Sequence, residues 1–231
     1  MDYNKERADF SLEVPEFYNF GFDVIDKRAR EADKTAFISI DRSGKNIVHH
    51  SFSDLQRNSN RFANALGDLG VAKGDHIFVM IPRIPAWYHV MIGCIKAGVV
   101  SMPGTNLLMP KDIEYRINMA GAKVAVVTAG HVEKIEEIKS KCPTLELLIV
   151  IGGEHEGWTT YEAACAVASD TLEQDALEAT RSDETMLVYF TSGTTSMPKM
   201  VGRDHSYGAA HKITGDYWAD LREDDVHWTL T

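Results

Sequence analysis

The stretch that decides the fold runs from Gly74 to Gly104 and reads GDHIFVMIPRIPAWYHVMIGCIKAGVVSMPG. Within it, His76–Ile81 is a mostly apolar run of the kind that predicts a buried strand. Pro85–Ala97 follows as a predicted helix, with proline in its first turn and Gly98 as its stop. Val99–Met102 then predicts a second buried strand. This order of strand, helix and strand is typical of a parallel sheet.

The same alternation continues downstream as far as Gly152-Gly153. The further helices predicted are Pro110–Ala120 and His131–Lys141, and the further strands are Val124–Val127 and Leu147–Ile151. These strands are apolar throughout instead of alternating apolar and polar residues, which indicates burial on both faces. The sequence therefore predicts an α/β fold, with a mostly parallel sheet that carries helices on both of its faces.

The segment before these elements predicts two helices and a hairpin. Apolar positions at helical spacing predict a first helix over Pro15–Ala32. Ala36–Ile40 and Asn46–Ser51 predict the two strands of a hairpin around a polar turn. Ser53 and Gln56 have the spacing of a capping box, which would start the second helix. The apolar stripe of that helix and the glycine that ends it are Leu55, Phe62, Leu66, Leu69 and Gly70.

The segment after the last of these strands predicts a short helix, a connector and a strand that leads to a candidate site. Gly157–Ala168 predicts the helix, and residues 170–184 are rich in acids and predict a surface connector. Thr185–Phe190 is a buried type of strand. The elements expected farther on are a strand over Met200–Arg203, a helix over Ser206–Trp218 and the start of a strand over Val226–Thr231.

The composition excludes several classes of protein. The chain has 231 residues, with 24 Lys and Arg against 34 Asp and Glu, and a formal net charge of −10. Apolar residues make up 44% and charged residues 25%, which excludes wholly disordered, collagen-like and coiled-coil proteins. The acidic balance argues against non-specific nucleic-acid binding. No apolar run approaches the roughly 20 residues that a membrane span needs.

The cysteines and the first residues predict a cytoplasmic protein. Cys94, Cys142 and Cys165 are an odd number, lie far apart and form no CxxC pair, so we expect no disulfide framework. Residues 1–17 carry several charges and no apolar core, unlike a secretory signal, and their acids are unlike a transit peptide. Both features are typical of a reducing compartment.

The segment Thr191–Lys199 (TSGTTSMPK) is the stretch whose composition points to chemistry. Eight of its nine residues are small, hydroxylated, glycine, proline or lysine, and it directly follows a predicted buried strand. Ligands of parallel sheets collect beyond the carboxyl ends of the strands. Gly193 lets the backbone approach a ligand closely, and successive amides in such a turn can form an anion-binding nest. The hydroxyls add donors and Lys199 adds a point charge, so the segment predicts a polyphosphate site.

Two other interpretations of this segment compete with that one. Gly193 and Lys199 have the six-residue separation of a P-loop, but Pro198 replaces its second glycine and Met200 replaces its Mg²⁺-binding hydroxyl. Ser196 and Lys199 have the SxxK spelling of a serine acyl-enzyme, but the chain has neither KTG nor SDN. Each interpretation lacks the partner residues that its chemistry needs.

Tyr189–Lys199 (YFTSGTTSMPK) closely resembles the ATP-phosphate motif of the acyl-CoA synthetase/luciferase superfamily of adenylate-forming enzymes, usually written (Y/F)TSG(S/T)TGxPK. The resemblance extends over nearly the whole chain and is greatest to the medium-chain acyl-CoA synthetase branch. The other segments that carry it are Phe20–Val24, Gly74-Asp75, Ile81–Trp87, Gly93–Gly98, Met102–Thr105, Asp112–Arg116, Lys199-Met200 and Trp228-Thr229. Ser196 departs from the motif, because the family has a second glycine there. If that position needs a positive φ, serine costs about 1 kcal/mol or more.

The resemblance implies a fold, a reaction and a set of site residues. The chain would be part of the large N-terminal domain of an adenylate-forming enzyme. Residues 1–184 would form a first α/β subdomain, and residues 185–231 would begin a second subdomain that carries the phosphate loop. ATP and a carboxylate would give an acyl-adenylate and pyrophosphate, and CoA would then displace AMP. The residues implied to cradle the ATP phosphates are Thr191, Ser192, Gly193, Thr194, Thr195, Ser196 and Lys199.

The resemblance also implies that much of the enzyme follows residue 231. In the family, the adenine and ribose motifs, the Mg²⁺-binding Glu, the hinge, the catalytic lysine and most of the acyl pocket come later. We therefore expect residues 1–231 to contain no catalytic residue and no metal ligand, and to be inactive alone. The implied cofactors are ATP, Mg²⁺ and CoA as co-substrate, and the implied partner is a medium-chain fatty or aromatic carboxylic acid. No nucleic acid is implied, and homo-oligomerisation is left open.

Alternatives to this function remain at the level of the sequence. One is a truncated, non-catalytic fold that binds phosphate weakly at most, and another is a sister-branch aryl-CoA ligase or adenylation domain. Two other groups of residues are assigned to packing instead of chemistry. Trp87, Tyr88 and Met91 are expected to pack in the core or an interface, and Arg83 and Arg116 are expected to form structural ion pairs.

Overall fold

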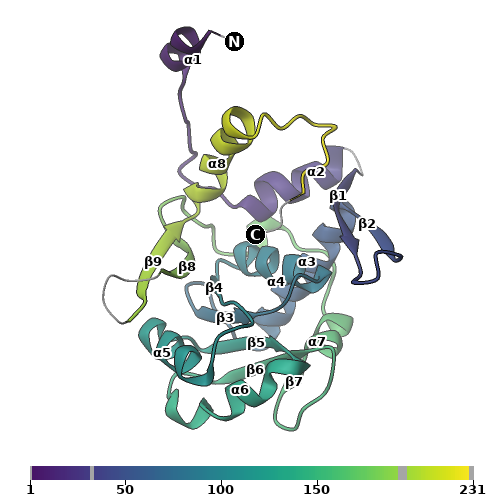
Figure 1. Ribbon diagram of the computed structural model, residues 1–231, viewed down its shortest axis with the longest axis vertical. Coiled ribbons are helices and arrows are strands. Elements are labelled where there is room, and N and C mark those ends of the chain that lie inside the picture. Colours follow the sequence, from purple (N-terminus) through teal and green to yellow (C-terminus); the bar gives the residue numbers. More distant parts are fainter. Residues whose placement is uncertain (1, 32–33, 192–196, 229–231) are drawn as a thin grey trace.

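The computed structural model describes residues 2–31, 34–191 and 197–228, and Figure 1 shows a large sheet with a separate hairpin. The large sheet has seven strands in the order β7-β6-β5-β3-β4-β8-β9, and β1 pairs with β2. The strands are β1 (Thr35–Ile40), β2 (Ile47–Ser51), β3 (His76–Met80), β4 (Val100–Pro103), β5 (Val124–Thr128), β6 (Leu147–Ile151), β7 (Thr159–Thr160), β8 (Thr185–Thr191) and β9 (Lys199–Asp204). Neighbours in the large sheet are parallel except β8 and β9, which are antiparallel.

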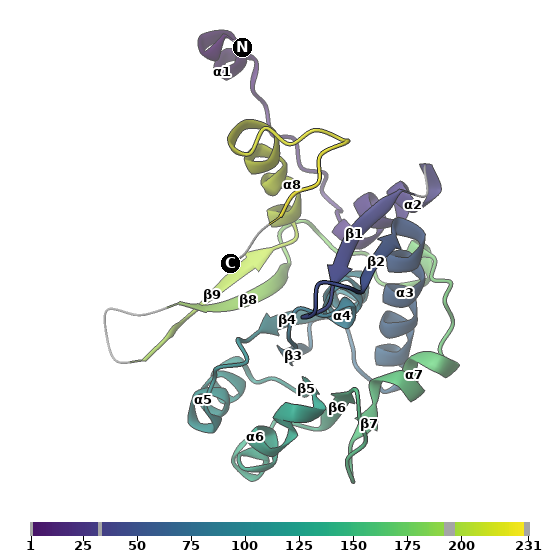
Figure 2. The ribbon, with the colours of Figure 1, turned by 45° about the vertical axis from the view of Figure 1, so that its right-hand side comes forward.

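Helices cover both faces of this sheet, as Figure 2 shows, with α3, α4 and α7 on one side and α5 and α6 on the other. The α-helices are α1 (Tyr3–Asp9), α2 (Lys27–Glu31), α3 (Phe52–Asp68), α4 (Pro85–Lys96), α5 (Pro110–Ala120), α6 (Val132–Glu136), α7 (Tyr161–Val167) and α8 (Ser206–Ile213). Single π turns occupy Gly21–Asp26 and Thr214–Trp218, and 3-10 turns occupy Ala129–His131, Lys139–Lys141 and Gln174–Ala176. No helix in the described part of the chain is long and apolar enough to cross a bilayer.

The apolar strands supply both helical layers because successive side chains of a strand point to opposite faces. Ile77 and Val79 of β3 belong to the core beneath α3 and α4. Phe78 and Met80 belong to the core beneath α5 and α6. All four side chains are fully or almost fully buried. The predicted α/β fold, with a mostly parallel sheet and helices on both faces, is confirmed.

Several elements begin and end where the sequence predicts. Helix α5 occupies Pro110–Ala120 as expected, and Gly121 after it takes a φ of 62°. Helix α4 begins at Pro85 and ends shortly before Gly98, which has a φ of 65°. All three cysteines are free, as expected, and all three are buried.

The capping box of α3 lies two residues earlier than predicted. Ser51 and Asp54 form it, and Ser53 and Gln56 do not. The Asp54 amide donates to Ser51 Oγ at 3.1 Å, and the Ser51 amide donates to Asp54 Oδ2 at 3.0 Å. Strand β2 therefore passes directly into the helix, because its last residue is also the cap.

The helical segment predicted over Pro15–Ala32 starts at Gly21 and not at Pro15. Phe17 forms an antiparallel bridge with Arg181, and the Tyr18 amide donates to the Thr180 carbonyl at 3.1 Å. The backbone groups of Phe17 and Tyr18 therefore pair with the connector before β8 and not within a longer helix. This pairing joins residues more than 160 positions apart, so local periodicity could not reveal it.

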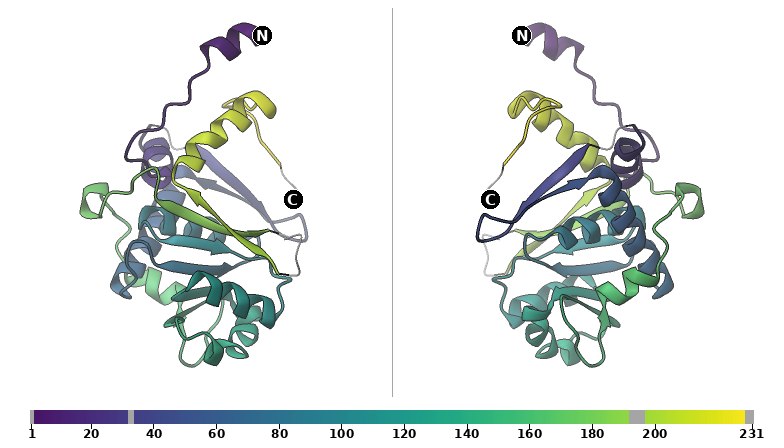
Figure 3. Two further views of the ribbon diagram at one scale, coloured as in Figure 1. Left: turned by 90° about the vertical axis from the view of Figure 1, so that its left-hand side faces the viewer. Right: turned by 90° about the vertical axis from the view of Figure 1, so that its right-hand side faces the viewer.

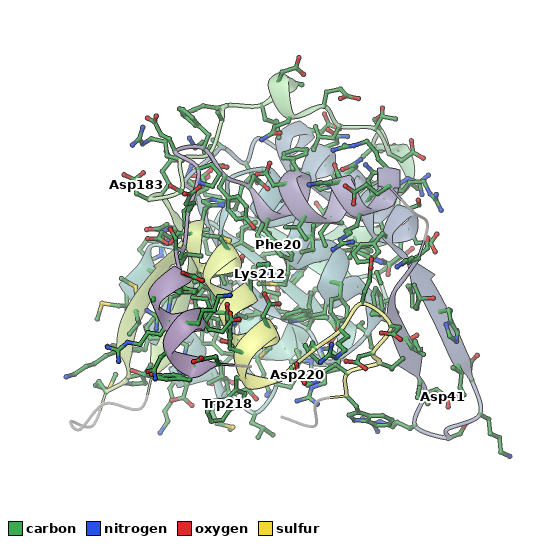
Figure 4. All side chains as sticks on the ribbon, turned by 90° about the horizontal axis from the view of Figure 1, so that it is seen from above. Phe20, Asp41, Asp183, Lys212, Trp218 and Asp220 are labelled. Carbon is green, nitrogen blue, oxygen red and sulfur yellow. The ribbon has the colours of Figure 1, made fainter. Side chains whose placement is uncertain are left out.

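Three other predicted elements are shorter or differ in kind. The helix predicted over His131–Lys141 is α6 followed by a separate 3-10 turn, although Ile138 stays buried. The helix predicted over Ser206–Trp218 is α8 followed by a π turn. Residues 226–228 form no strand, and residues 229–231 lie outside the described residues. Tyr217 of this π turn contacts Phe10 of the N-terminal segment, with ring centroids 6.2 Å apart. In Figure 4, the neighbouring Trp218 and the hairpin turn with Asp41 lie at different sides of the molecule.

The aromatic residues of α4 pack as expected. Met91 is buried in the core, and Trp87 packs against that core while partly exposed. The Tyr88 ring stacks on Phe37 of β1 with centroids 4.3 Å apart, so α4 and the hairpin share an aromatic contact.

Helices α3 and α4 approach each other closely at Gly93. A Cβ at this position would lie 2.9 Å from both the Phe62 ring and the Ser59 carbonyl oxygen. Because a backbone oxygen cannot move aside cheaply, Gly93→Ala should lower the free energy of unfolding by about 1–3 kcal/mol. Gly67→Ala is the matched control, since Gly67 lies exposed in α3 with nothing within 4 Å of the new methyl group. It should raise stability by about 0.5–1 kcal/mol, and urea unfolding of both variants checks the difference in sign.

His89 of α4 gives the fold a predictable response to pH. Burial, with a smaller contribution from His50, lowers the pKa of His89 to about 4, and its Nδ1 lies 3.2 Å from the Tyr161 hydroxyl. In the unfolded chain this pKa is about 6.5, so between pH 6.5 and 4 the unfolded state binds a proton that the folded state does not. Stability should fall by up to about 3 kcal/mol as the pH drops through this window. In His89→Gln that loss should be absent, while the two proteins should behave alike above pH 7.

Candidate functional site

The candidate phosphate segment joins β8 to β9 at the carboxyl edge of the sheet. Thr191 is the last residue of β8, Lys199 is the first residue of β9, and the two lie opposite each other in the antiparallel ladder. Both side chains are exposed. The other five predicted site residues, Ser192, Gly193, Thr194, Thr195 and Ser196, lie outside the described residues. Of the predicted set, the structure therefore brings together the two residues at its ends.

The first half of strand β8 is buried in the core, and its second half extends to this edge. Met186, Leu187 and Val188 are buried, and Leu187 lies opposite Ser101 of β4. From Tyr189 onward the strand becomes partly exposed and continues beside β9, away from the parallel strands. Figure 3 shows the two strands running together across the molecule. The sequence thus places a polar, hydroxyl-rich segment at the outer end of a strand anchored in the core.

Lys199 is the positive charge that the sequence predicts for this site. Within the described part of the chain, no hydrogen bond or ion pair engages its ammonium group. A lysine ammonium offers three donors and no acceptor, so beside the Thr191 hydroxyl it can serve an anion. Among the described residues, no three His, Cys, Asp or Glu side chains are grouped so that they could hold a metal ion.

Helix α5 holds both ends of the segment, a contact that the sequence analysis did not predict. The Tyr115 hydroxyl donates to the Pro198 carbonyl at 3.0 Å. The Tyr115 and Phe190 rings also form a T-shaped contact, with centroids 6.2 Å apart. Asp112–Arg116 is one of the segments that carry the family resemblance, but nothing in that pattern assigns Tyr115 to the phosphate segment.

Arg116 does not form the ion pair expected of it in the described part of the chain. Its guanidinium lies over the Phe190 ring, 5.3 Å from the centroid, and it donates to the Asp112 carbonyl at 2.8 Å. Burial lowers the pKa of Arg116, and Asp112 partly opposes that shift. The Phe190 face takes the place of a carboxylate partner because Arg116 packs against β8.

The loop that leads into α5 is tied down at the same edge of the sheet. The Lys134 ammonium donates to the carbonyl oxygens of Asn106 and Leu108, each at 2.9 Å. Gly104 follows β4 where a Cβ would lie 2.9 Å from both Phe78 and Leu108. The Lys134 hydrogen bonds and the close packing at Gly104 therefore hold the loop that leads into α5.

Comparison with known proteins agrees with this architecture. A family model described as AMP-binding enzyme matches residues 25–231. The mitochondrial acyl-coenzyme A synthetase ACSM3 of Mus musculus is 35% identical over 239 residues, and the match covers 100% of this chain and 40% of that protein. The mitochondrial acyl-coenzyme A synthetase ACSM2B of Homo sapiens is 34% identical, with 95% of this chain and 39% of that protein covered.

Two solved structures have the same fold. An acyl-CoA synthetase of Brucella canis superposes with a TM-score of 0.87 at 25% identity and covers 99% of this chain and 43% of its own. The anthranilate CoA ligase AuaEII, in complex with anthranoyl-AMP, superposes with a TM-score of 0.77 at 26% identity and covers 89% of this chain and 38% of its own. The chain spans about 40% of the length of the curated relatives it matches. With the family model matched from residue 25 to residue 231, the chain belongs to the AMP-binding enzyme family.

Proposed function

We propose that the protein containing this chain is an ATP-dependent acyl-CoA synthetase. It would convert a carboxylic acid and ATP to an acyl-adenylate and pyrophosphate, and then transfer the acyl group to CoA. The observation that carries the proposal is the segment Thr191–Lys199, which joins two strands at the carboxyl edge of the sheet in a member of the AMP-binding family. Ligands of parallel sheets collect at that edge.

The proposed phosphate site consists of Thr191, Ser192, Gly193, Thr194, Thr195, Ser196 and Lys199. Attack of a carboxylate on the α-phosphorus makes pyrophosphate the leaving group, and its growing charge needs fixed donors and cations. Amides and hydroxyls of the segment would donate to the β- and γ-phosphates, and Lys199 would add a positive charge. Mg²⁺ bound to ATP would neutralise part of the phosphate charge. In this proposal its protein ligand is not among residues 1–231.

The proposed substrate is a medium-chain fatty acid or an aromatic acid. The acyl-coenzyme A synthetases among the relatives support an acyl substrate, and the anthranilate CoA ligase supports an aromatic one. A sister-branch aryl-CoA ligase is the alternative within this class. Residues 1–184 and 185–231 are proposed as a first subdomain and the start of a second. A cytoplasmic location also stays a prediction, while the curated relatives carry the word mitochondrial in their names.

The test is release of pyrophosphate that depends on both ATP and a carboxylate. The complete open reading frame that contains residues 1–231 should release pyrophosphate with butyrate, octanoate or benzoate, and should form a thioester when CoA is added. Residues 1–231 alone should do neither, because the adenine site, the acyl pocket and the late lysine are proposed to lie elsewhere. Absence of turnover with every acid in the complete protein would contradict the ligase assignment. Turnover by residues 1–231 alone would contradict the proposed division of the enzyme.

A further inference from the structure

Tyr115 of α5 contacts the end of the phosphate segment. Ile113 and Ile117, on the other side of the helix, are fully buried and fix α5 on the sheet. Tyr115 is half-buried and forms part of the wall of an open hollow of about 490 Å³ along α5. Its hydroxyl is bound by the protein, because it donates a hydrogen bond to the Pro198 carbonyl at 3.0 Å.

The contact with Pro198 constrains Lys199 more than an ordinary hydrogen bond would. The pyrrolidine ring of Pro198 fixes its φ, and proline has no N–H group to form a competing backbone bond. The peptide group that joins Pro198 to Lys199 is planar, so a hydrogen bond to its oxygen orients the whole plane. The hydrogen bond from Tyr115 therefore acts on the peptide plane that leads into Lys199, whose backbone is also paired with Thr191 in the ladder.

At the other end of the segment, Tyr115 is joined by its neighbour Arg116. The Phe190 ring contacts both Tyr115, with ring centroids 6.2 Å apart, and the Arg116 guanidinium, which lies 5.3 Å from its centroid. Phe190 directly precedes Thr191, which lies opposite Lys199 in the ladder. Tyr115 therefore contacts the neighbours of both Thr191 and Lys199, and it is placed to set how these two residues face a ligand.

We propose that Tyr115 is a positioning residue for ATP, which acts through the Pro198 carbonyl on Lys199. The proposal rests on the phosphate role of Lys199 in the proposed function. It assigns no chemistry to the Tyr115 hydroxyl itself, which is already engaged by the protein. The expected consequence is that loss of the Tyr115 hydroxyl weakens the binding of ATP and leaves the binding of the carboxylic acid unchanged.

The test compares Tyr115→Phe with wild type in the complete protein. Loss of one neutral hydrogen bond should raise KM for ATP by about 3- to 10-fold. KM for the carboxylic acid should stay within about 2-fold, and the melting temperature should stay within about 2 °C, because the ring and its packing remain. Tyr161→Phe is the matched control: it removes a tyrosine hydroxyl that lies 3.2 Å from His89, on α7 across the sheet. It should leave KM for ATP unchanged.

A double variant separates this proposal from the phosphate role of Lys199. If Tyr115 acts through Lys199, adding Tyr115→Phe to Lys199→Ala should change kcat/KM for ATP by less than about 2-fold, since coupled sites are not additive. Fully additive effects of the two substitutions on kcat/KM for ATP would overturn the positioning role. An unchanged KM for ATP in Tyr115→Phe would also overturn it, provided that Lys199→Ala is impaired. An equal rise in both KM values would also overturn it, because that indicates a general structural effect. If Lys199→Ala itself behaves as wild type, the proposed phosphate site is wrong.

Discussion

Lys199→Ala in the complete protein should lower kcat/KM for ATP by about 100-fold. Removing one fixed donor from a site that stabilises developing negative charge typically costs about 10²- to 10³-fold in rate. Lys199 is exposed at the start of β9 and has no partner within the described part of the chain, so its side chain adds little to stability. The variant should therefore unfold at the same temperature as wild type. Carboxylate-dependent exchange of pyrophosphate into ATP measures the first step alone.

Two further variants show whether the charge at this position matters. Lys45→Ala removes an exposed lysine from the hairpin turn beside Asp41, which lies far from β9 in Figure 4. It should exchange pyrophosphate at the wild-type rate. Lys199→Arg keeps the charge but changes the donor geometry, so it should recover part of the lost activity. A Lys199→Ala protein that kept its full adenylation rate would falsify the phosphate role of this lysine.

The parts of the fold that proline and glycine delimit could be predicted from the sequence. Helix α5 starts at Pro110 and ends before Gly121 because both effects act within a few residues. The start of the helical segment at Gly21 could not be predicted in this way. Phe17 and Tyr18 are extended because they pair with Arg181 and Thr180, and that pairing depends on the completed fold.

The candidate site likewise has one part that the sequence predicts and one part that it does not. The segment Thr191–Lys199 is contiguous, so its composition alone marks it as a place for phosphate. Tyr115 lies more than 80 residues from Pro198, and its hydroxyl reaches that carbonyl because the order of strands brings α5 beside the end of β8. A single sequence carries no signal for such a contact. The family resemblance marks the residues around Tyr115 but not their partner.

A second long-range contact, the buried ion pair of Lys96, should have the largest effect on stability. Lys96 lies within the apolar run of α4, and its ammonium is 2.6 Å from Asp26 Oδ1 and 2.6 Å from Asn60 Oδ1. The side chains of Lys96 and Asp26 are 0% and 2% exposed. Burial lowers the pKa of Lys96, and the Asp26 carboxylate opposes that shift. The Phe22 ring lies 5.5 Å from the ammonium and closes the site from another side.

Lys96→Met should lower the free energy of unfolding by about 3–5 kcal/mol, because it leaves the Asp26 carboxylate buried without its partner. Methionine keeps most of the length and volume of the side chain, so the loss should come from the charge and not from a cavity. Lys27→Ala is the matched control, since Lys27 forms an exposed pair with Glu31 at 3.8 Å. Such surface pairs contribute about 0–1 kcal/mol, and the control should unfold close to wild type.

The double variant Lys96→Met with Asp26→Leu decides whether the unpaired charge is the cause. Once both charges are gone, no buried ion remains to be desolvated, and the double variant should be more stable than Lys96→Met alone. Asn60 would still lack its lysine donor, so recovery should be incomplete. Urea unfolding of the four proteins gives the coupling between the two positions. If the double variant were less stable than Lys96→Met alone, the unpaired Asp26 carboxylate would not be the cause of the loss.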